Sequence, residues 1–267
     1  MPSVKVGRYS KRSPIIDVAA FLGVIALITW VTGAGSAKLG YNWQWYRVPQ
    51  YLLTYEEGRW FAGPLIDGLL VTFEITGASL VLAFGFGLTS ALCRLSDSSL
   101  ARMIARAYLE LIRNTPLLVQ LFFMYFVLAP IFDLSRFASA VLALSLFEGA
   151  YASEIFRSGI VSIHKGQWEA AHSLGLSTFD TYRRIILPQA IRRTLPPLTS
   201  QAISLVKDSA LVSTIAVYDL TMRGREIISE TFLAFEIWFT IAVIYLIVTV
   251  SLSIVVSRME RQFGESA

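Results

Sequence analysis

The chain has 267 residues, of which 55% are hydrophobic and only 16% are charged, and its mean hydropathy is +0.58. Soluble domains carry about 25% charged residues, so this composition excludes an ordinary soluble domain and predicts an integral membrane protein. The net charge of +4 is modest, and a single cysteine, Cys93, excludes an internal disulfide and a cysteine metal cluster. The two histidines, His164 and His172, lack neighbouring metal ligands, so we expect no metal and no cofactor.

Apolar segments of membrane-spanning length follow one another along the chain. About 20 apolar residues are needed for a helix to cross the hydrocarbon core. We therefore predict an all-α integral membrane protein with about six transmembrane helices, at roughly 15–33, 65–93, 108–131, 137–157, 196–217 and 235–257. No strong internal repeat or flexible linker interrupts them, which favours a single membrane domain.

The first of these segments, 15–33, has two interpretations. Its basic flank, its apolar stretch and the small-residue run from Gly33 to Ala37 are typical of a cleaved signal peptide. The apolar stretch is long for a signal peptide, which favours a retained helix. Either interpretation leaves the orientation of the remaining spans unchanged.

An aromatic segment, residues 41–61, follows the first span. It carries eight aromatic side chains: Tyr41, Trp43, Trp45, Tyr46, Tyr51, Tyr55, Trp60 and Phe61. Trp and Tyr favour the headgroup zone of a bilayer. The segment is therefore predicted to be an interfacial helix that anchors the next span, or else a docking surface for an extracytoplasmic protein.

The basic residues of the connecting segments predict the orientation. With the N-terminus placed in the cytoplasm, the inside segments hold 16 Lys and Arg, the outside segments hold 6, and Lys207 lies within a span. Cytoplasmic loops of membrane proteins carry the excess of positive charge. We therefore expect both termini, and the long polar loop 159–195, on the cytoplasmic side.

Within that loop the residues predict two short helices across the membrane surface. Helix-forming residues run from Ile163 to Leu174, Gly175 suits a left-handed helix end, and Ser177 can cap a second helix. Pro188 ends that second helix or begins the next element. Such a helix–turn–helix could transmit force to the spans, or it could be an amphipathic connector resting on lipid headgroups.

Charged residues also fall inside the predicted spans, where a charge costs about 2.5–3.5 kcal/mol on insertion scales. Lys207 and Asp208 lie midway along the fifth span, Glu148 and Glu154 lie in the fourth, and Glu74 lies in the second. We expect them to share a polar interior. They could bind the charged groups of a passing solute, Lys207 could pair with Glu148 as a switch, or that pair could be a static ion pair that fixes the helix register.

The cytoplasmic entry of the third span adds further candidates. Glu110 and Arg113 are i, i+3 neighbours, and Pro116 predicts a kink. Nearby polar side chains could satisfy freed backbone groups or line a passage. The full set of candidate pathway residues is Glu74, Asn114, Thr115, Glu148, Tyr151, Glu154, Lys207 and Asp208.

The polar loop contains the most specific pattern, GQWEAAHSLGLSTFDTYRRIILP from 166 to 188. Its spacing of Glu-Ala-Ala, Gly and Leu-Pro resembles the cytoplasmic EAA loop of bacterial ABC importer permeases. Further stretches resemble the polar amino acid permease family of these importers: GLLVTFEIT (68–76), ELIRNTPLLVQLFF (110–123), GAYASEIFRSGI (149–160), LPQAIRRTLPPLTSQ (187–201) and ISLVKDSALVSTI (203–215). The resemblance covers about 64–260. The first 60 residues lie largely outside it, and their extra span departs from the family's five-span type I core.

The resemblance implies an inner-membrane permease that translocates polar amino acids. It also implies its partners: two ATP-binding subunits, a second identical or sibling permease subunit, an extracytoplasmic solute-binding protein, the amino acid and membrane lipid, but no nucleic acid. The residues that would meet the ATPase are Gly166, Glu169, Ala170, Ala171, Gly175, Leu187 and Pro188. Ala170 and Ala171 would leave room for the partner, and Glu169 would dock by its charge.

The expected organisation has three parts: 1–63 holds the basic N-terminus, the extra span and the aromatic segment, 64–260 is the permease domain, and 261–267 is a tail. The chain has no phosphate-binding loop of the form G-x-x-x-x-G-K-[ST], so we do not expect it to hydrolyse ATP. The rival hypothesis is a self-contained secondary transporter or channel. The absence of a recognisable catalytic set in the sequence disfavours a membrane enzyme.

Overall fold

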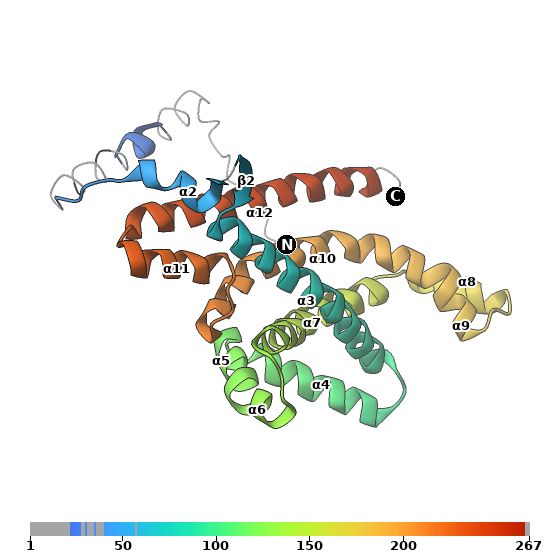
Figure 1. Ribbon diagram of the computed structural model, residues 1–267. Helices are drawn as coiled ribbons and strands as arrows, with labels where there is room; N and C mark the ends of the chain where they lie inside the picture. The colour runs from blue at the N-terminus through green and yellow to red at the C-terminus, as the bar shows by residue number, and fades with distance from the viewer. Residues whose placement is uncertain (1–21, 28–29, 31–34, 36–39, 57, 265–267) are drawn as a thin grey trace, which may run out of the picture. The chain divides into compact units, whose positions relative to one another are not determined.

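The computed structural model describes residues 22–27, 30, 35, 40–56 and 58–264 (Figure 1). The chain divides into two compact units, Met1–Gln44 and Trp45–Ala267. In the first unit residues 22–27 are helical, and the rings of Tyr41 and Trp43 pack edge to face with centroids 5.2 Å apart. Most of the predicted span 15–33 lies outside the described residues.

The second unit begins with short elements rather than the interfacial helix predicted for 41–61. A 3-10 turn, η1 (Trp45–Arg47), and a short helix, α2 (Pro49–Leu52), precede an antiparallel hairpin of β1 (Leu53–Glu56) and β2 (Arg59–Ala62). In the hairpin register Leu53 pairs with Ala62, and Tyr55 pairs with Trp60. Aromatic residues favour extended strands, in which cross-strand rings can pack. This preference accounts for the hairpin in place of the predicted helix.

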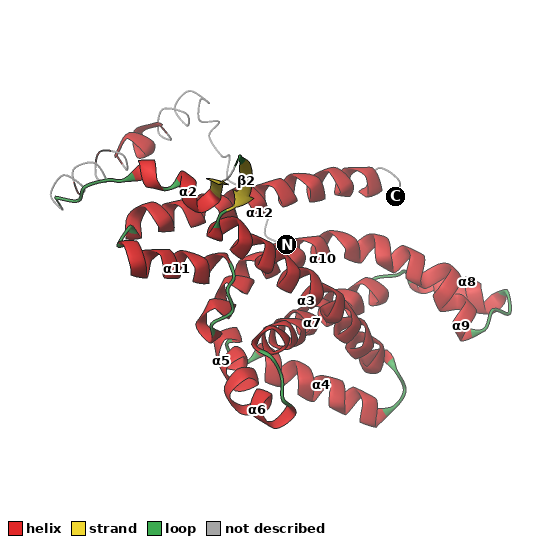
Figure 2. Ribbon diagram, viewed as in Figure 1, coloured by secondary structure: helices red, strands yellow, loops and turns green. Residues whose placement is uncertain are grey.

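Almost all of the remaining chain is helical (Figure 2). Among the described residues three helices are long and apolar enough to cross a membrane: α3 (Pro64–Leu95), α7 (Arg136–Val161) and α12 (Ala234–Gly264). These three helices confirm the spans predicted at 65–93, 137–157 and 235–257. α11 (Leu220–Thr231) lies between the last two predicted spans and begins at Asp219, whose carboxylate accepts from the Met222 N–H at 2.8 Å.

The third predicted span is wrong as a continuous helix over 108–131. Instead α4 (Ser99–Arg113) ends at Asn114, and the chain turns by 106° into α5 (Leu117–Phe122), the π-helical η2 (Phe123–Leu128) and α6 (Ala129–Phe132). Pro116 causes the break, because it has no N–H for an α-helix and it disfavours helical backbone in the residue before it. The predicted kink is therefore a sharp bend. The bent pair can count as a fourth span.

The second helix of the polar loop is not short. α9 (Thr178–Thr181), the π-helical η3 (Tyr182–Ile186), α10 (Leu187–Asp208) and the 3-10 turn η4 (Ser209–Ile215) follow one another without a break. Pro188 therefore neither ends a helix nor separates the loop from the predicted fifth span. The wide π-helical turn just before it accommodates a ring that would clash with a carbonyl of a regular α-helix.

Small residues hold α3 and α7 together. Added Cβ atoms at Gly87 and Gly149 would lie 2.7 Å from Ala152 Cβ and 3.2 Å from the Ala83 carbonyl, respectively. Such close approach of two backbones is typical of helix pairs in membranes. Residues later in α3 contact residues later in α7: Ser79 contacts Val141, and Arg94 contacts Glu154. The two helices therefore run parallel. The largest core cluster forms around them, with Ile75, Leu121, Leu144, Leu205 and Val212 fully buried.

Candidate functional site

The predicted first helix of the polar loop is present as α8 (Lys165–Ser173). His164 caps its start, with Nδ1 accepting from the Gly166 N–H at 3.0 Å. Gly175 has a φ of +72°, so it terminates the helix in the left-handed conformation that glycine tolerates best. Ser177 Oγ then accepts from the Asp180 N–H at 3.1 Å and starts α9, as predicted.

The two alanines of the EAA pattern differ in exposure. Ala170 is exposed, together with Glu169, whose carboxylate pairs with Lys165 Nζ at 3.4 Å on the same face. Ala171 is fully buried inside the chain. Only one of the two alanines can therefore leave room for a partner, because the other makes room for the chain's own packing.

α8 is attached to the ends of two long helices. Ile163, at the end of α7, packs with Ile186 and Ala190 of η3 and α10, and the rings of Trp168 and Tyr182 meet edge to face at 5.1 Å. Nη1 of Arg193 donates to the Ser162 carbonyl at 2.7 Å. A Cβ on Gly159 would overlap Thr194, so the backbones of α7 and α10 are also close. A displacement of α8 therefore acts on both helices.

The outer surface of this loop includes two large apolar side chains that sequence reasoning missed. Leu174 is 77% exposed and Phe179 is 70% exposed, on either side of the Gly175 turn. Pro188 is exposed as well, and Leu187 is half-buried. Two bulky apolar residues beside a glycine turn in an otherwise polar loop are the signal that could have identified them. Exposed side chains of this kind suit burial against a partner protein.

The predicted pair between Lys207 and Glu148 is not formed among the described residues. Glu148 is 2% exposed, and its Oε2 accepts from Gln201 Nε2 at 2.7 Å. Asp208 lies close enough to interact with the same carboxylate, at the end of α10, whereas Lys207 points to the exposed side. On a helix, adjacent residues point about 100° apart, so only one of the two can face Glu148.

Glu154 belongs to a different cluster. Its Oε1 accepts from Arg94 at 2.7 Å and from Arg113 at 3.2 Å, and its Oε2 accepts from Arg157 at 3.3 Å. Glu74 is exposed on α3. The polar interior predicted to be shared by all these charges is therefore formed only in part, because Glu148 and Asp208 meet while Glu154 and Glu74 do not join them. Glu148, Glu154 and Glu74 occupy three separate places.

The polar residues at the bend between α4 and α5 satisfy backbone carbonyls, which is the structural role predicted as one alternative. Asn114 Nδ2 donates to the Glu110 carbonyl at 2.8 Å and to its carboxylate at 2.9 Å, and Thr115 Oγ1 donates to the Leu111 carbonyl at 2.9 Å. Arg113 pairs with Glu154 in place of its predicted neighbour Glu110. The guanidinium of Arg113 also lies 5.7 Å from the centre of the Tyr151 ring.

A family model matches residues 83–264, and it describes the binding-protein-dependent transport system inner membrane component. The chain is 42% identical over 207 residues to the glutamine transport system permease protein GlnP of Escherichia coli (strain K12), covering 76% of this chain and 94% of that relative. It is 41% identical over 201 residues to the L-cystine transport system permease protein TcyB of Bacillus subtilis (strain 168), covering 74% and 86%, respectively.

Solved structures share the fold. A chain described as the crystal structure of an amino acid ABC transporter with histidines matches with a TM-score of 0.70 and 38% identity, covering 74% of this chain and 94% of that one. A chain of the MetNI methionine ABC transporter in an inward-facing conformation matches with a TM-score of 0.64 at 20% identity. The bend between α4 and α5 and the continuous α9–α10 helix therefore lie within a fold that solved transporters share.

Proposed function

Since the chain belongs to the family of binding-protein-dependent transport system inner membrane components, we propose that it is the permease subunit of an ABC importer for a polar amino acid. The observation that carries the proposal is the geometry of α8. This helix has an exposed outer face and an inner face fixed to the ends of α7 and α10. A partner that moves α8 would therefore move α10 and α7, and α7 is long and apolar enough to cross the membrane.

The energy comes from other subunits. ATP-binding subunits dock on the exposed side of the EAA loop, at Gly166, Glu169, Ala170, Gly175 and Pro188, with Ala171 and Leu187 supporting that surface from behind. A second permease subunit, identical or a sibling, completes the passage, and a solute-binding protein delivers the amino acid from outside. Both termini and the loop 159–195 lie in the cytoplasm of this inner-membrane protein, in line with the distribution of Lys and Arg.

The amino acid passes close to Glu148. That carboxylate is buried with Gln201 and Asp208 beside it, and its Oε1 has no hydrogen-bond partner among the described residues. A buried acceptor without a partner suits the ammonium group that every amino acid carries. Six other residues complete the proposed pathway set and shape the passage without contacting Glu148. They are Glu74, Asn114, Thr115, Tyr151, Glu154 and Lys207.

The test is uptake by the assembled transporter in proteoliposomes with ATP inside and binding protein outside. Glu169→Lys and Gly175→Asp should abolish uptake, while the loaded binding protein still binds to the complex. Gly58→Asp is the matched control for backbone strain, since Gly58 has a φ of +80° outside the loop, and Glu230→Lys is the control for charge.

Normal uptake in both loop variants would overturn the coupling role. Uptake driven by an ion gradient alone, without ATP-binding subunits, would instead establish a secondary transporter.

A further inference from the structure

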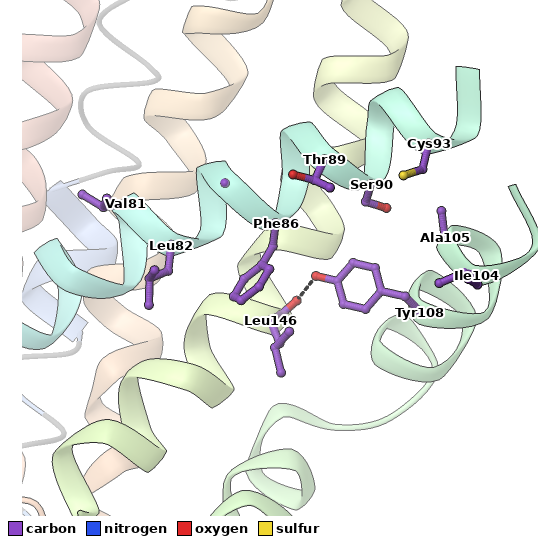
Figure 3. Close-up of a pocket in the computed structure, with 11 residues that line it drawn as sticks. Val81, Leu82, Phe86, Thr89, Ser90, Cys93, Ile104, Ala105, Tyr108 and Leu146 are labelled. Carbon is purple, nitrogen blue, oxygen red and sulfur yellow. Dashed lines mark hydrogen bonds between the residues drawn. The ribbon is translucent and has the colours of Figure 1, made fainter. Parts of the chain in front are cut away.

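A lateral pocket of about 500 Å³ lies between α3 and α4, with one wall from α7 (Figure 3). Its lining is almost entirely apolar and consists of Val81, Leu82, Gly85, Phe86, Thr89, Ser90, Cys93, Ile104, Ala105, Tyr108 and Leu146. The hydroxyl of Tyr108 donates to the Leu146 carbonyl at 2.6 Å, so it is not free for a ligand. Within the described part of the chain no charged side chain lines this pocket, which disfavours it as a site for a charged amino acid.

The pocket is long and open at the side. Its α3 wall runs from Val81 to Cys93, and 12 residues of helix rise about 18 Å, close to the ~15 Å depth of one leaflet of the hydrocarbon core. Val81 is 72% exposed and Leu82 is 40% exposed, so this wall continues into the outer surface of a membrane-spanning helix. Lipid chains surround that surface in the bilayer.

Ser90 lies at the end of the pocket nearest Arg94. Ser90 is 7% exposed, and its Oγ has no hydrogen-bond partner among the described residues. It lies one helical turn before the arginine that marks the end of α3. An ester carbonyl of a phospholipid is an acceptor for such a hydroxyl. A buried hydroxyl without a partner is unfavourable, so an acceptor bound there is stabilising.

α4 itself has the pattern of a helix in the membrane interface. Leu100, Met103, Ile104 and Leu111 form an apolar stripe, each side chain 60–68% exposed. Arg102, Arg106, Glu110 and Arg113 form a charged stripe beside it. Its contacts fit a crosswise position, because both its start and its end lie near the end of α3. Arg102 donates to the Ser96 carbonyl, and Arg113 donates to Glu154, the same carboxylate that pairs with Arg94. A helix with these two stripes lies in the headgroup boundary, and its basic residues attract anionic lipid.

We propose that the pocket between α3 and α4 binds one acyl chain of an anionic phospholipid. Its glycerol ester accepts from Ser90, and its phosphate lies beside Arg102, which lines a neighbouring cavity of α4 with Arg106. Nη1 of Arg102 donates to the Ser96 carbonyl at 2.7 Å, which holds this guanidinium at the turn just after Cys93. The bound lipid fixes α4 against α3. This site goes beyond the transport function and does not depend on it.

The test uses the full chain with its partner subunits in liposomes of phosphatidylethanolamine and phosphatidylglycerol. The probe is phosphatidylglycerol with a photoreactive diazirine in its acyl chain, and adducts are mapped by mass spectrometry. Adducts should concentrate on the pocket residues. Gly85→Leu should reduce them several-fold, because no atom lies within 4 Å of a Cβ there and the new side chain fills the pocket. Gly77→Leu is the matched control on the same helix, equally open but outside the pocket.

A second pair of variants keeps the test decisive if Gly85→Leu fails to fold. Ile104→Trp fills the pocket from the α4 side, and Met103→Trp is its control on the adjacent exposed position. Arg102→Gln should remove the preference for phosphatidylglycerol over a matched phosphatidylethanolamine probe, whereas Arg192→Gln, an exposed arginine of α10, should leave it.

Several results would overturn the proposal. Unchanged adducts in Gly85→Leu and Ile104→Trp would do so, as would equal labelling of pocket and α12 surface. Oxidation that links Cys93 of two copies in high yield, with adducts absent, would show instead that the pocket faces a second permease chain.

Discussion

Three arginines, from α3, α4 and α7, converge on the carboxylate of Glu154. The side chains of Glu154 and Arg94 are only 29% and 19% exposed, so water screens their contact less than it screens a surface pair. Glu154→Gln should lower the free energy of unfolding by about 1.5–3 kcal/mol, the range for hydrogen bonds to charged groups. Thermal unfolding in detergent measures this loss of stability. Glu230→Gln, on an exposed carboxylate, is the control, and equal melting temperatures of the two variants would contradict the expectation.

Asp219, outside the membrane-spanning helices, makes stability depend on pH. Burial raises the pKa of Asp219 to about 6 from its ordinary 3.8, although N–H donors such as that of Met222 oppose the shift. The folded state therefore binds this proton more tightly than the unfolded state does. That contribution is complete below about pH 4 and is lost as the pH rises through about 6. A shift of two units corresponds to roughly 2–3 kcal/mol.

Asp219→Asn keeps an acceptor for the Met222 N–H and removes the charge. Its melting temperature, relative to that of the unaltered chain, should rise between pH 4 and pH 7. Asp97→Asn, on an exposed aspartate of the loop before α4, should show no such trend. A constant difference between the Asp219 variant and the unaltered chain across this pH range would refute the assignment.

At the scale of elements, the outer side of the EAA loop combines a charge with two apolar side chains, Leu174 and Phe179. Burying a large apolar side chain contributes about 1.5–3 kcal/mol. Leu174→Ser with Phe179→Ser should therefore weaken binding of the ATP-binding subunits at least tenfold while the permease still folds. Co-purification and ATP hydrolysis by the complex measure this. Ile191→Ser, 56% exposed on α10, is the control, and retained subunits in the double variant would exclude the docking role.

The residues of α8 were predictable because local signals decide them. Gly175 and Ser177 act on their own neighbours, so helix end and cap follow from residue type. The bend at Pro116 was predictable in place but not in size, since its 106° depends on how α4 packs against α3 and α7. The continuity through Pro188 was not predictable, because it rests on a π-helical turn that no local pattern indicates.

The charges show the same division between local and tertiary information. Membrane depth follows from position along a span, so Glu148 and Glu154 were correctly placed in one helix. Which partner each meets depends on helix rotation and on arginines from elements far apart in the chain, as with Arg94 and Arg113. Hydropathy contains no information about these partners. Sequence reasoning therefore wrongly predicted that all of these charges share one polar interior.

At the scale of the whole molecule, everything assigned to coupling, passage and lipid lies in the unit Trp45–Ala267. The family model supports this division, because the residues that it matches, 83–264, all lie in that unit. A chain that begins at Trp45 after an initiating Met should therefore assemble with its partner subunits and retain ATP-driven uptake.

Uptake per purified complex, measured beside the full chain, tests that expectation. The physical reason for it is that the three buried clusters found among the described residues, around Leu144, Leu220 and Ile186, are built entirely from residues after 45. Loss of the ATP-binding subunits from the shortened chain would contradict it, since these subunits are expected on α8. Retained subunits with lost uptake would place a transport role in the first 44 residues, because the docking element would then be intact and only passage or delivery would have failed.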